Sequence, residues 1–452
     1  MGFWFSRCRR VIQPAHCDGG RVFVGSHNGH VYSLDAQSGC YHWDYTASAG
    51  VRTAITVASI DGRYVALFGD RRAHAYSVDI DTGRTVWKVT AEDVPNAHIT
   101  GSPSLFEGRL YVPITVGDDS AAVDPKYTCC QGRGAMVALD AATGKEIWKT
   151  YTIPEARPCG KSSIGTQLWG PSGASIWSSP TIDAKRRLLY AGTGDNHSAP
   201  ATDTSDAVSA FSLDFGKIEW SRQLTAGDMG NGACYASDKT NCPEPHGPDF
   251  DFGSSPNLIE LENGHRLLTI GQKSGLVWAL DPDDRGRVVW KTRVGQGGIL
   301  GGVQWGTATD GKIVYAAVSD ISFFHPVLGQ PLIPDPDKGG GLHALQAATG
   351  AVLWAAPPVR ACGNRKNCSP AQSGAVTATP DYVLSGSVDG HLRAYSTADG
   401  SVLWDFDTAK PFATVNGVAA NGGSLDSAGP TIATGMLFVN SGYGLYGGQA
   451  AY

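Results

Sequence analysis

One pattern recurs seven times along the chain and constrains its fold more than any other feature. A tryptophan follows a glycine by four residues at Gly39/Trp43, Gly83/Trp87, Gly144/Trp148, Gly216/Trp220, Gly286/Trp290, Gly350/Trp354 and Gly400/Trp404. A segment with alternating apolar and polar residues, such as VYSLD or VWALD, precedes each glycine, and a second one, such as RVFVG or LLYAG, precedes that. Each unit therefore predicts three or more strands joined by tight turns, and their regular recurrence indicates a repeat architecture.

A fixed tryptophan in every unit is best explained by packing between neighbouring blades of a β-propeller. An eighth unit, residues 429–444, has two strand-like segments but no tryptophan, and the first unit has no clear inner strand before Arg21. We therefore predict an all-β, eight-bladed β-propeller that forms a single domain over residues 21–452. Residues 1–20 are interpreted as a remnant of the first inner strand. We expect the closing blade to be incomplete, with the two ends of the chain meeting in it.

Composition excludes several classes of partner. The 452 residues include 58 glycines, and only 17% are charged, as suits a sheet protein with many tight turns. The net charge of −6 argues against a nucleic-acid partner. We find no apolar run long enough to span a bilayer.

Ten cysteines indicate an oxidising compartment rather than the cytosol. The sequence has no C-x-x-C, which argues against a zinc ribbon, and no C-x-x-C-H for a c-type haem. The cysteines therefore predict a periplasmic or secreted location. The start, MGFWFSRCRR, has no apolar signal region, so we expect that no signal peptide is present in this chain. We expect loop disulfides in three close couples, namely Cys234/Cys242, Cys362/Cys368 and Cys8/Cys17.

Two cysteines, Cys129 and Cys130, are adjacent and so can hardly join distant segments. A bond between neighbours strains the peptide between them, and such strain is usually kept at functional sites. We therefore predict that this pair lies on the functional face. The alternative is that its thiols are free or separately paired.

Charged residues follow the ends of several predicted strands. Asp195 stands just after Gly192, Lys273 after Gly271, and Asp118 after the long strand of the third unit, while Asp249 and Asp251 precede the fifth unit. In a propeller these ends meet at one end of the central channel. Converging carboxylates repel one another unless a cation holds them, which favours a hard metal such as calcium. The alternative is that they are ordinary polar turn residues.

Several stretches together resemble one family, the quinoprotein alcohol dehydrogenases. They are GRVFVGSHNGHVYSLDAQSG, IWSSPTIDAKRRLLYAGTGDN, GPDFDFGSSP, GQKSGLVWALDP, GGVQWG, CSPAQSGAVTA and NGGSLDSAGP. The family consists of eight-bladed propellers that use pyrroloquinoline quinone (PQQ), and the sequence is most similar to its polyvinyl-alcohol-dehydrogenase-like branch.

The resemblance implies which residues bind PQQ. Trp177 matches the tryptophan that stacks on the flat ring, although a plain core position is the alternative. Arg52, Thr100 and Thr115 match groups that bind the PQQ carboxylates. Gln304 matches a side-chain amide contact.

The resemblance also implies the metal ligands and the catalytic pair. Asp118 and Asp195 match ligands that are commonly glutamate and asparagine, so this chain departs from the usual set. Asp249 matches the catalytic base and is counted among the ligands, and Lys273 matches the cation beside the reactive carbonyl and the cofactor. Asp251 matches a position that some members add for a lanthanide ion, but Ca²⁺ is preferred here.

The vicinal cysteines depart from the family pattern as well. In methanol-oxidising members such a pair precedes the matched arginine, where this chain has Thr46-Ala47. Here the pair follows Asp118 instead. We expect Cys129 and Cys130 to face PQQ on the side opposite Trp177.

The resemblance thus implies PQQ- and metal-dependent oxidation of secondary or polymeric alcohols, with electrons passed to an external cytochrome c. The alternative is a non-catalytic scaffold that resembles outer-membrane-assembly propellers, or a decayed relative. A scaffold has no reason to keep Asp118, Trp177, Asp195, Asp249 and Lys273 together.

Overall fold

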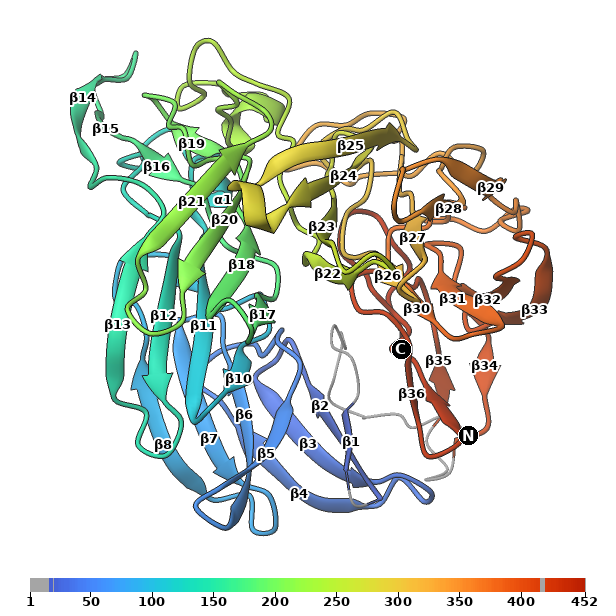
Figure 1. Ribbon diagram of the computed structural model, residues 1–452. Helices are drawn as coiled ribbons and strands as arrows, with labels where there is room; N and C mark the ends of the chain where they lie inside the picture. Colours follow the sequence, from blue (N-terminus) through green and yellow to red (C-terminus); the bar gives the residue numbers. More distant parts are fainter. Residues whose placement is uncertain (1–15, 19, 415–418, 452) are drawn as a thin grey trace.

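Seven antiparallel sheets follow one another around a ring (Figure 1); six have four strands, and the third has a short fifth strand, β9 (Ala97–His98), that also pairs with β11 (Arg109–Val116). The computed structural model describes residues 16–18, 20–414 and 419–451. Within each sheet the strands pair in chain order, so every blade is built from hairpins. Only short helical turns interrupt this pattern in the described part of the chain, and the predicted all-β propeller is confirmed.

The first four blades contain the strands that carry most of the predicted site. They comprise β1 (His16–Asp18), β2 (Arg21–Gly25), β3 (His30–Asp35) and β4 (Tyr41–Thr46); β5 (Thr56–Ile60), β6 (Arg63–Gly69), β7 (His74–Asp79) and β8 (Thr85–Thr90); β10 (Ser104–Phe106), β11 (Arg109–Val116), β12 (Ala135–Asp140) and β13 (Glu146–Tyr151); and β17 (Thr181–Asp183), β18 (Leu188–Gly192), β20 (Ala207–Ser212) and β21 (Ile218–Gln223).

The next three blades are regular. They comprise β22 (Asn257–Glu260), β23 (Arg266–Gly271), β24 (Leu276–Asp281) and β25 (Arg287–Arg293), with the short turn η2 (Pro282–Asp284); β26 (Ala308–Thr309), β27 (Ile313–Ala317), β28 (Leu342–Gln346) and β29 (Val352–Ala356); and β30 (Thr377–Ala378), β31 (Tyr382–Gly386), β32 (His391–Ser396) and β33 (Val402–Asp407). The hairpin β34 (Pro411–Phe412) and β35 (Ala420–Asn421) follows them.

Six of the seven repeated tryptophans lie between blades, as predicted. Trp43 of the first blade covers Gly83 of the second, where a Cβ atom would lie 2.9 Å from the indole Cγ. Its Nε1–H donates to Ile80 O at 2.7 Å, and the tryptophans of four later blades make the equivalent bond. Gly83 has φ +68°, a conformation that favours glycine in the turn. The seventh tryptophan, Trp404, is 43% exposed.

Among the described residues, a two-stranded hairpin lies where an eighth blade would close the ring. Strands β36 (Thr431–Ala433) and β37 (Met436–Phe438) form a separate two-stranded sheet. Met436 and Phe438 pack against the core of the first blade, and Val439 packs against that of the seventh. The incomplete eighth unit is therefore confirmed within the described residues. Strand β1 pairs with β2 and completes the first blade. The expectation that both chain ends share the closing blade depends on residues 1–15, which lie outside the described residues, and stays a prediction.

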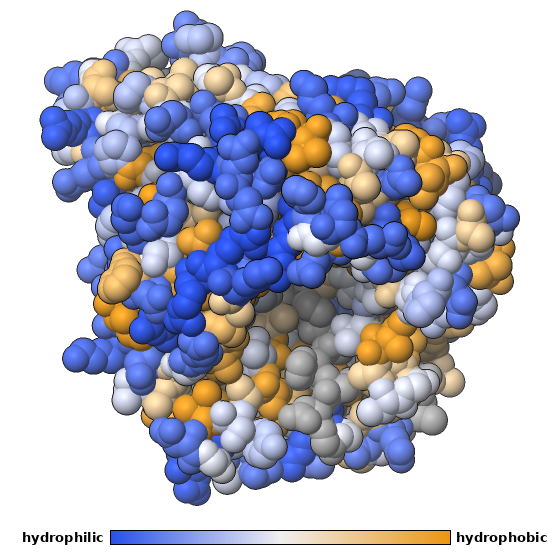
Figure 2. Space-filling view, viewed as in Figure 1, coloured by the Kyte–Doolittle hydropathy of each residue, from blue (hydrophilic) through white to orange (hydrophobic). Residues whose placement is uncertain are grey.

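Several short elements gather at one end of the third and fourth blades (Figure 1). They are α1 (Asp118–Ala121), β9 (Ala97–His98), β14 (Arg157–Lys161), β15 (Gln167–Gly170), β16 (Ser172–Gly173), β19 (Asn196–Ser198) and η1 (Gly232–Tyr235). Figure 2 shows a hollow near the middle of the face seen in Figure 1, with a band of hydrophilic residues along its upper side and more hydrophobic residues on its right and below. Among the described helices, none is long and apolar enough to cross a membrane.

Candidate active site

A lysine and three carboxylates from neighbouring blades meet at one end of the channel. Lys273 Nζ donates to Asp249 Oδ1 at 2.7 Å and to Asp251 Oδ2 at 2.8 Å. The Asp195 main-chain N–H donates to Asp251 Oδ1 at 2.7 Å. Ligand oxygens of the three aspartates lie within 4.8 Å of one another. The structure therefore brings together four of the predicted site residues.

Local backbone features hold this group in place. Asp195 follows β18 after Gly194, where a Cβ atom would lie only 2.6 Å from Asp251 Oδ1, so the close approach requires glycine. Asp249 has φ +59°. Its N–H donates to Asp228 Oδ1 at 3.0 Å, which anchors this turn. Lys273 follows β23, and its N–H donates to Asp251 O at 3.1 Å.

The surroundings shift the pKa values of the two carboxylates that bind Lys273 in opposite directions. Burial raises the pKa of Asp249 well above its usual range, because the opposing attraction of Lys273 is outweighed by burial and by the charge of Asp251. Burial acts on Asp251 in the same direction, but Lys273 and the N–H of Asp195 outweigh it and lower the pKa of Asp251. Asp251 is therefore the anionic partner of Lys273, and Asp249 is the carboxylate that more readily holds a proton.

The group carries more negative charge than its single lysine balances. Burial, and then Asp251 and Asp249, raise the pKa of Asp195 well above its usual range. Asp206 is fully buried, and neither of its carboxylate oxygens has a hydrogen-bond partner. Its pKa is raised in the same way, by burial and then by Asp251 and Asp228. A cluster that is rich in carboxylate oxygens and lacks balancing positive charge fits a hard cation.

Asp118 does not belong to this group. It begins α1, where Oδ1 accepts from the Tyr127 hydroxyl at 2.7 Å. Oδ2 accepts from the N–H groups of Gln131 and Gly132 at 2.9 and 2.6 Å. Because these donors follow Cys130 directly, the contacts of Asp118 fix the loop that carries the two cysteines.

Cys129 and Cys130 form a disulfide with each other and are buried. Trp169 brackets the pair, since its N–H donates to Cys129 O at 2.7 Å and its O accepts from the Cys130 N–H at 3.1 Å. Asn231 Nδ2 lies 3.9 Å from Cys129 Sγ. Within the described part of the chain, we find no contact between the cysteine pair and Trp177. The position of the pair opposite the Trp177 ring therefore stays a prediction.

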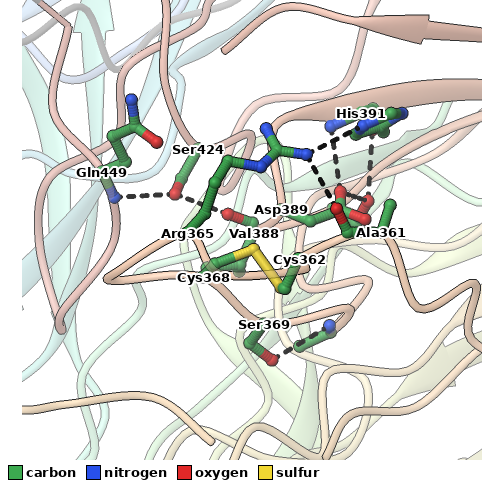
Figure 3. Close-up of a disulfide and its surroundings, with 12 residues drawn as sticks. Ala361, Cys362, Arg365, Cys368, Ser369, Val388, Asp389, His391, Ser424 and Gln449 are labelled. Carbon is green, nitrogen blue, oxygen red and sulfur yellow. Dashed lines mark hydrogen bonds between the residues drawn. A yellow bond between two sulfur atoms is a disulfide. The ribbon is translucent and has the colours of Figure 1, made fainter. Parts of the chain in front are cut away.

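Two of the predicted loop disulfides are confirmed, Cys234–Cys242 and Cys362–Cys368. Cys8 of the third couple lies outside the described residues. The loop closed by Cys362–Cys368 carries Arg365, whose Nη2 lies 3.1 Å from His391 Nε2 (Figure 3). The contact between Arg365 and His391 therefore fixes the disulfide-closed loop to the seventh blade.

Aromatic and cationic groups form a chain away from Lys273. Lys273 Nζ lies 5.5 Å from the centroid of the Trp177 ring. Trp305 meets Trp177 edge-on, with 5.3 Å between ring centroids. The guanidinium of Arg52 covers the Trp305 ring at 4.6 Å. Gly253 also packs against the Trp177 indole, where a Cβ atom would overlap the ring.

The remaining predicted groups supply polar contacts. The hydroxyls of Thr100 and Thr115 lie 2.6 Å apart. Gln304 is buried, and its Oε1 has no hydrogen-bond partner. An aromatic plate, paired hydroxyls, a guanidinium and an orphaned amide oxygen fit a flat, anionic, hydrogen-bonding cofactor such as PQQ.

Comparison with known proteins identifies the family. A family model, PQQ_2, described as "Outer membrane protein assembly factor BamB", matches residues 9–230, 273–421 and 338–449. The chain belongs to this PQQ_2 family.

Named relatives share much of this PQQ_2 chain. It is 44% identical over 435 residues to the polyvinylalcohol dehydrogenase of Pseudomonas sp, covering 94% of this chain and 66% of that protein. It is 41% identical over 436 residues to the polyvinylalcohol dehydrogenase of Sphingopyxis sp. (strain 113P3), covering 94% and 65%. The chain thus spans slightly less than two thirds of these relatives. The resemblance to polyvinyl-alcohol-dehydrogenase-like quinoproteins is confirmed.

A solved structure has the same fold. The quinohemoprotein alcohol dehydrogenase from Comamonas testosteroni matches with a TM-score of 0.66 at 17% identity, covering 98% of this chain and 74% of that one.

Sequence reasoning missed several residues of this PQQ_2 site. Asp206 and Asp228 come from loops without a motif, and only the fold brings them to Asp251 and Asp249. Tyr235 is another, since burial and then the charge of Asp249 raise the pKa of its phenol. Trp305 had a usable signal, because it follows Gln304 in GGVQWG and lies outside the repeated glycine–tryptophan pattern.

Proposed function

We propose that this protein oxidises alcohols with PQQ and a bound metal ion, and that electrons pass to an external cytochrome c. Secondary or polymeric alcohols are the proposed substrates, because the two relatives of highest identity reported above are named polyvinylalcohol dehydrogenases. Work in the periplasm or outside the cell is proposed from the loop disulfides. The observation that carries the proposal is the pairing of Lys273 with Asp249 and Asp251 beside Trp177.

Bound PQQ with Ca²⁺ would supply an electrophilic carbonyl that accepts hydride. In this proposal Asp195, Asp249 and Asp251 hold the metal, for which a lanthanide is the second candidate. Asp118 remains a predicted ligand, although both of its oxygens already accept hydrogen bonds. Excess negative charge around Asp195 is the main support for a cation here.

The chain's own residues divide the remaining work. Asp249 takes the alcohol proton, since its raised pKa makes it the better proton holder of the two carboxylates at Lys273. Asp251 keeps Lys273 charged and oriented. Lys273 then places its ammonium near the oxygen atom, of the alcohol or of the carbonyl that would accept hydride, on which negative charge develops.

The cofactor plane is held by different groups. Trp177 offers a ring for stacking. Arg52, Thr100 and Thr115 offer donors for carboxylates, and Gln304 offers an orphaned amide oxygen. The disulfide of Cys129 and Cys130 is proposed to bound the opposite side.

A scaffold function is the second candidate, because the matching family model is described as an outer membrane protein assembly factor. Against it stands the cost of burying Asp195, Asp206 and Asp249 near one another. Uncompensated buried charges destabilise a fold and serve no purpose in a scaffold.

Titration of the purified protein with PQQ, with and without Ca²⁺, tests the proposal. Dye-linked oxidation of a panel containing primary alcohols, secondary alcohols and poly(vinyl alcohol) should follow. We expect Ca²⁺-dependent binding of PQQ and turnover of secondary or polymeric alcohols. Absence of PQQ binding, or binding without oxidation of any alcohol, would favour the scaffold.

A further inference from the structure

A second arginine lies next to Arg52 at the start of the second blade. Val51 and Asp70 form an isolated antiparallel bridge. The Arg71 N–H donates to Gly50 O at 2.9 Å. Arg52 and Arg71 therefore flank the same bridge on its two strands. Burial, and then the charge of Arg52, lower the pKa of Arg71, so the two guanidinium groups act on each other.

Among the described residues neither guanidinium forms an ion pair, although Asp426, which accepts from Trp305 Nε1, faces Arg52: burial raises the pKa of Asp426, and the charge of Arg52 opposes that rise. Arg52 covers the ring of Trp305. Arg71 is half-buried, and its Nε is buried without a hydrogen-bond partner. Tyr443 and Tyr446 are the other titratable groups that face it. No carboxylate is among the charged groups that act on Arg71, and two adjacent arginines repel each other unless an anion lies between them.

The next segment of the chain adds to this positive region. The Ile99 N–H donates to Asp70 O at 3.0 Å, and the preceding residue, His98, pairs with Thr115 of β11. Burial, and then Arg71 and Arg52, lower the pKa of His98 to about 4. The field of both arginines therefore reaches the threonine predicted to bind a PQQ carboxylate.

We propose that Arg71 is a second guanidinium clamp, which acts with Arg52 to bind one carboxylate of the flat polycarboxylate held beside Trp177. This inference rests on the proposed function, since PQQ is the planar tricarboxylate which that function requires. Guanidinium groups bind carboxylates through two parallel hydrogen bonds, and partial burial strengthens such contacts. The orphaned Nε of Arg71 is a donor available for this purpose.

Equilibrium dialysis with PQQ and saturating Ca²⁺ tests the clamp without any turnover. The variants are Arg71→Gln, which removes the charge, and Arg71→Lys, which keeps it but loses the planar fork. The neighbouring, exposed Arg72 gives a matched control, Arg72→Gln. We expect Arg71→Gln to weaken PQQ binding by about 10- to 100-fold, Arg71→Lys to weaken it less, and Arg72→Gln to leave it unchanged. Circular dichroism verifies that each variant is folded.

The trimethyl ester of PQQ separates carboxylate recognition from general damage to the pocket. It should bind the wild type and Arg71→Gln equally. Equal binding of PQQ itself by the wild type and Arg71→Gln would overturn the clamp while leaving the proposed function intact. Equal losses for PQQ and its ester would also overturn it, because the arginine would then not read a carboxylate. A wild type that binds no PQQ would refute the proposed function, and the clamp with it.

Discussion

Replacement of Asp249 by asparagine tests the proposed proton transfer most directly. Asp249 Oδ1 accepts from Lys273 at 2.7 Å, and its main-chain N–H is anchored by Asp228 at 3.0 Å. Asparagine keeps an oxygen for Lys273 and leaves the backbone contact unchanged, but it cannot accept the alcohol proton. The side chain of Asp249 is 21% exposed, so a substrate hydroxyl can reach it.

The expected loss in kcat is about 10²- to 10⁴-fold, the usual effect of a general base. That range corresponds to about 3–5 kcal/mol of activation free energy. Because a general base must be deprotonated to act, the wild-type rate should fall as the pH drops and the Asp249 carboxylate becomes protonated. Asp249→Asn has no such group, so its residual rate should lose this dependence.

Turnover is measured with an artificial dye at saturating PQQ and Ca²⁺, and PQQ binding is measured separately by dialysis. Asp238→Asn is the control, since Asp238 is exposed and lies in the nearby loop closed by Cys234–Cys242. It should retain wild-type kcat. If Asp249→Asn binds PQQ and keeps near-full turnover, the base is another group, and Asp251 is the next candidate.

Three further predictions concern the cofactor, the cation and the blades. Trp177→Ala should weaken PQQ binding by about 1–3 kcal/mol; unchanged affinity in a folded variant would make Trp177 a plain core residue. Burial, and then neighbouring carboxylates, raise the pKa values of Asp195 and Asp206, so the folded apoprotein binds more protons than the unfolded chain, and its stability should fall as pH rises above about 4. Ca²⁺ should therefore raise Tm, measured by thermal unfolding, more at about pH 8 than at about pH 5. An equal shift of Tm at the two pH values would contradict a cation site formed by these carboxylates. Trp43→Ala should cost about 3–5 kcal/mol because Trp43 is buried between blades, whereas Trp404→Ala, at a 43% exposed position, should cost about 0.5 kcal/mol; similar losses of Tm in the two variants would refute this packing argument.

The repeat by itself determined the architecture. A glycine that can adopt positive φ and a tryptophan four residues later recur because each blade must turn tightly and then cover the next glycine, as Trp43 covers Gly83. The positions of Asp195 and Lys273 just after strands, and of Asp249 and Asp251 just before one, also predicted that these side chains meet, since strand ends converge on the channel. These signals are local in sequence, which is why they could be found there.

Only the tertiary structure decided which charged groups lie close enough to interact with one another. Asp118 carries the same carboxylate as Asp195, yet it binds the loop after Cys130, because the fold places Tyr127 and two N–H groups against it. Asp206 and Arg71 carry no motif. Their significance comes from burial and from neighbours contributed by other segments, and such long-range electrostatic contacts leave no pattern in the order of residues along the chain.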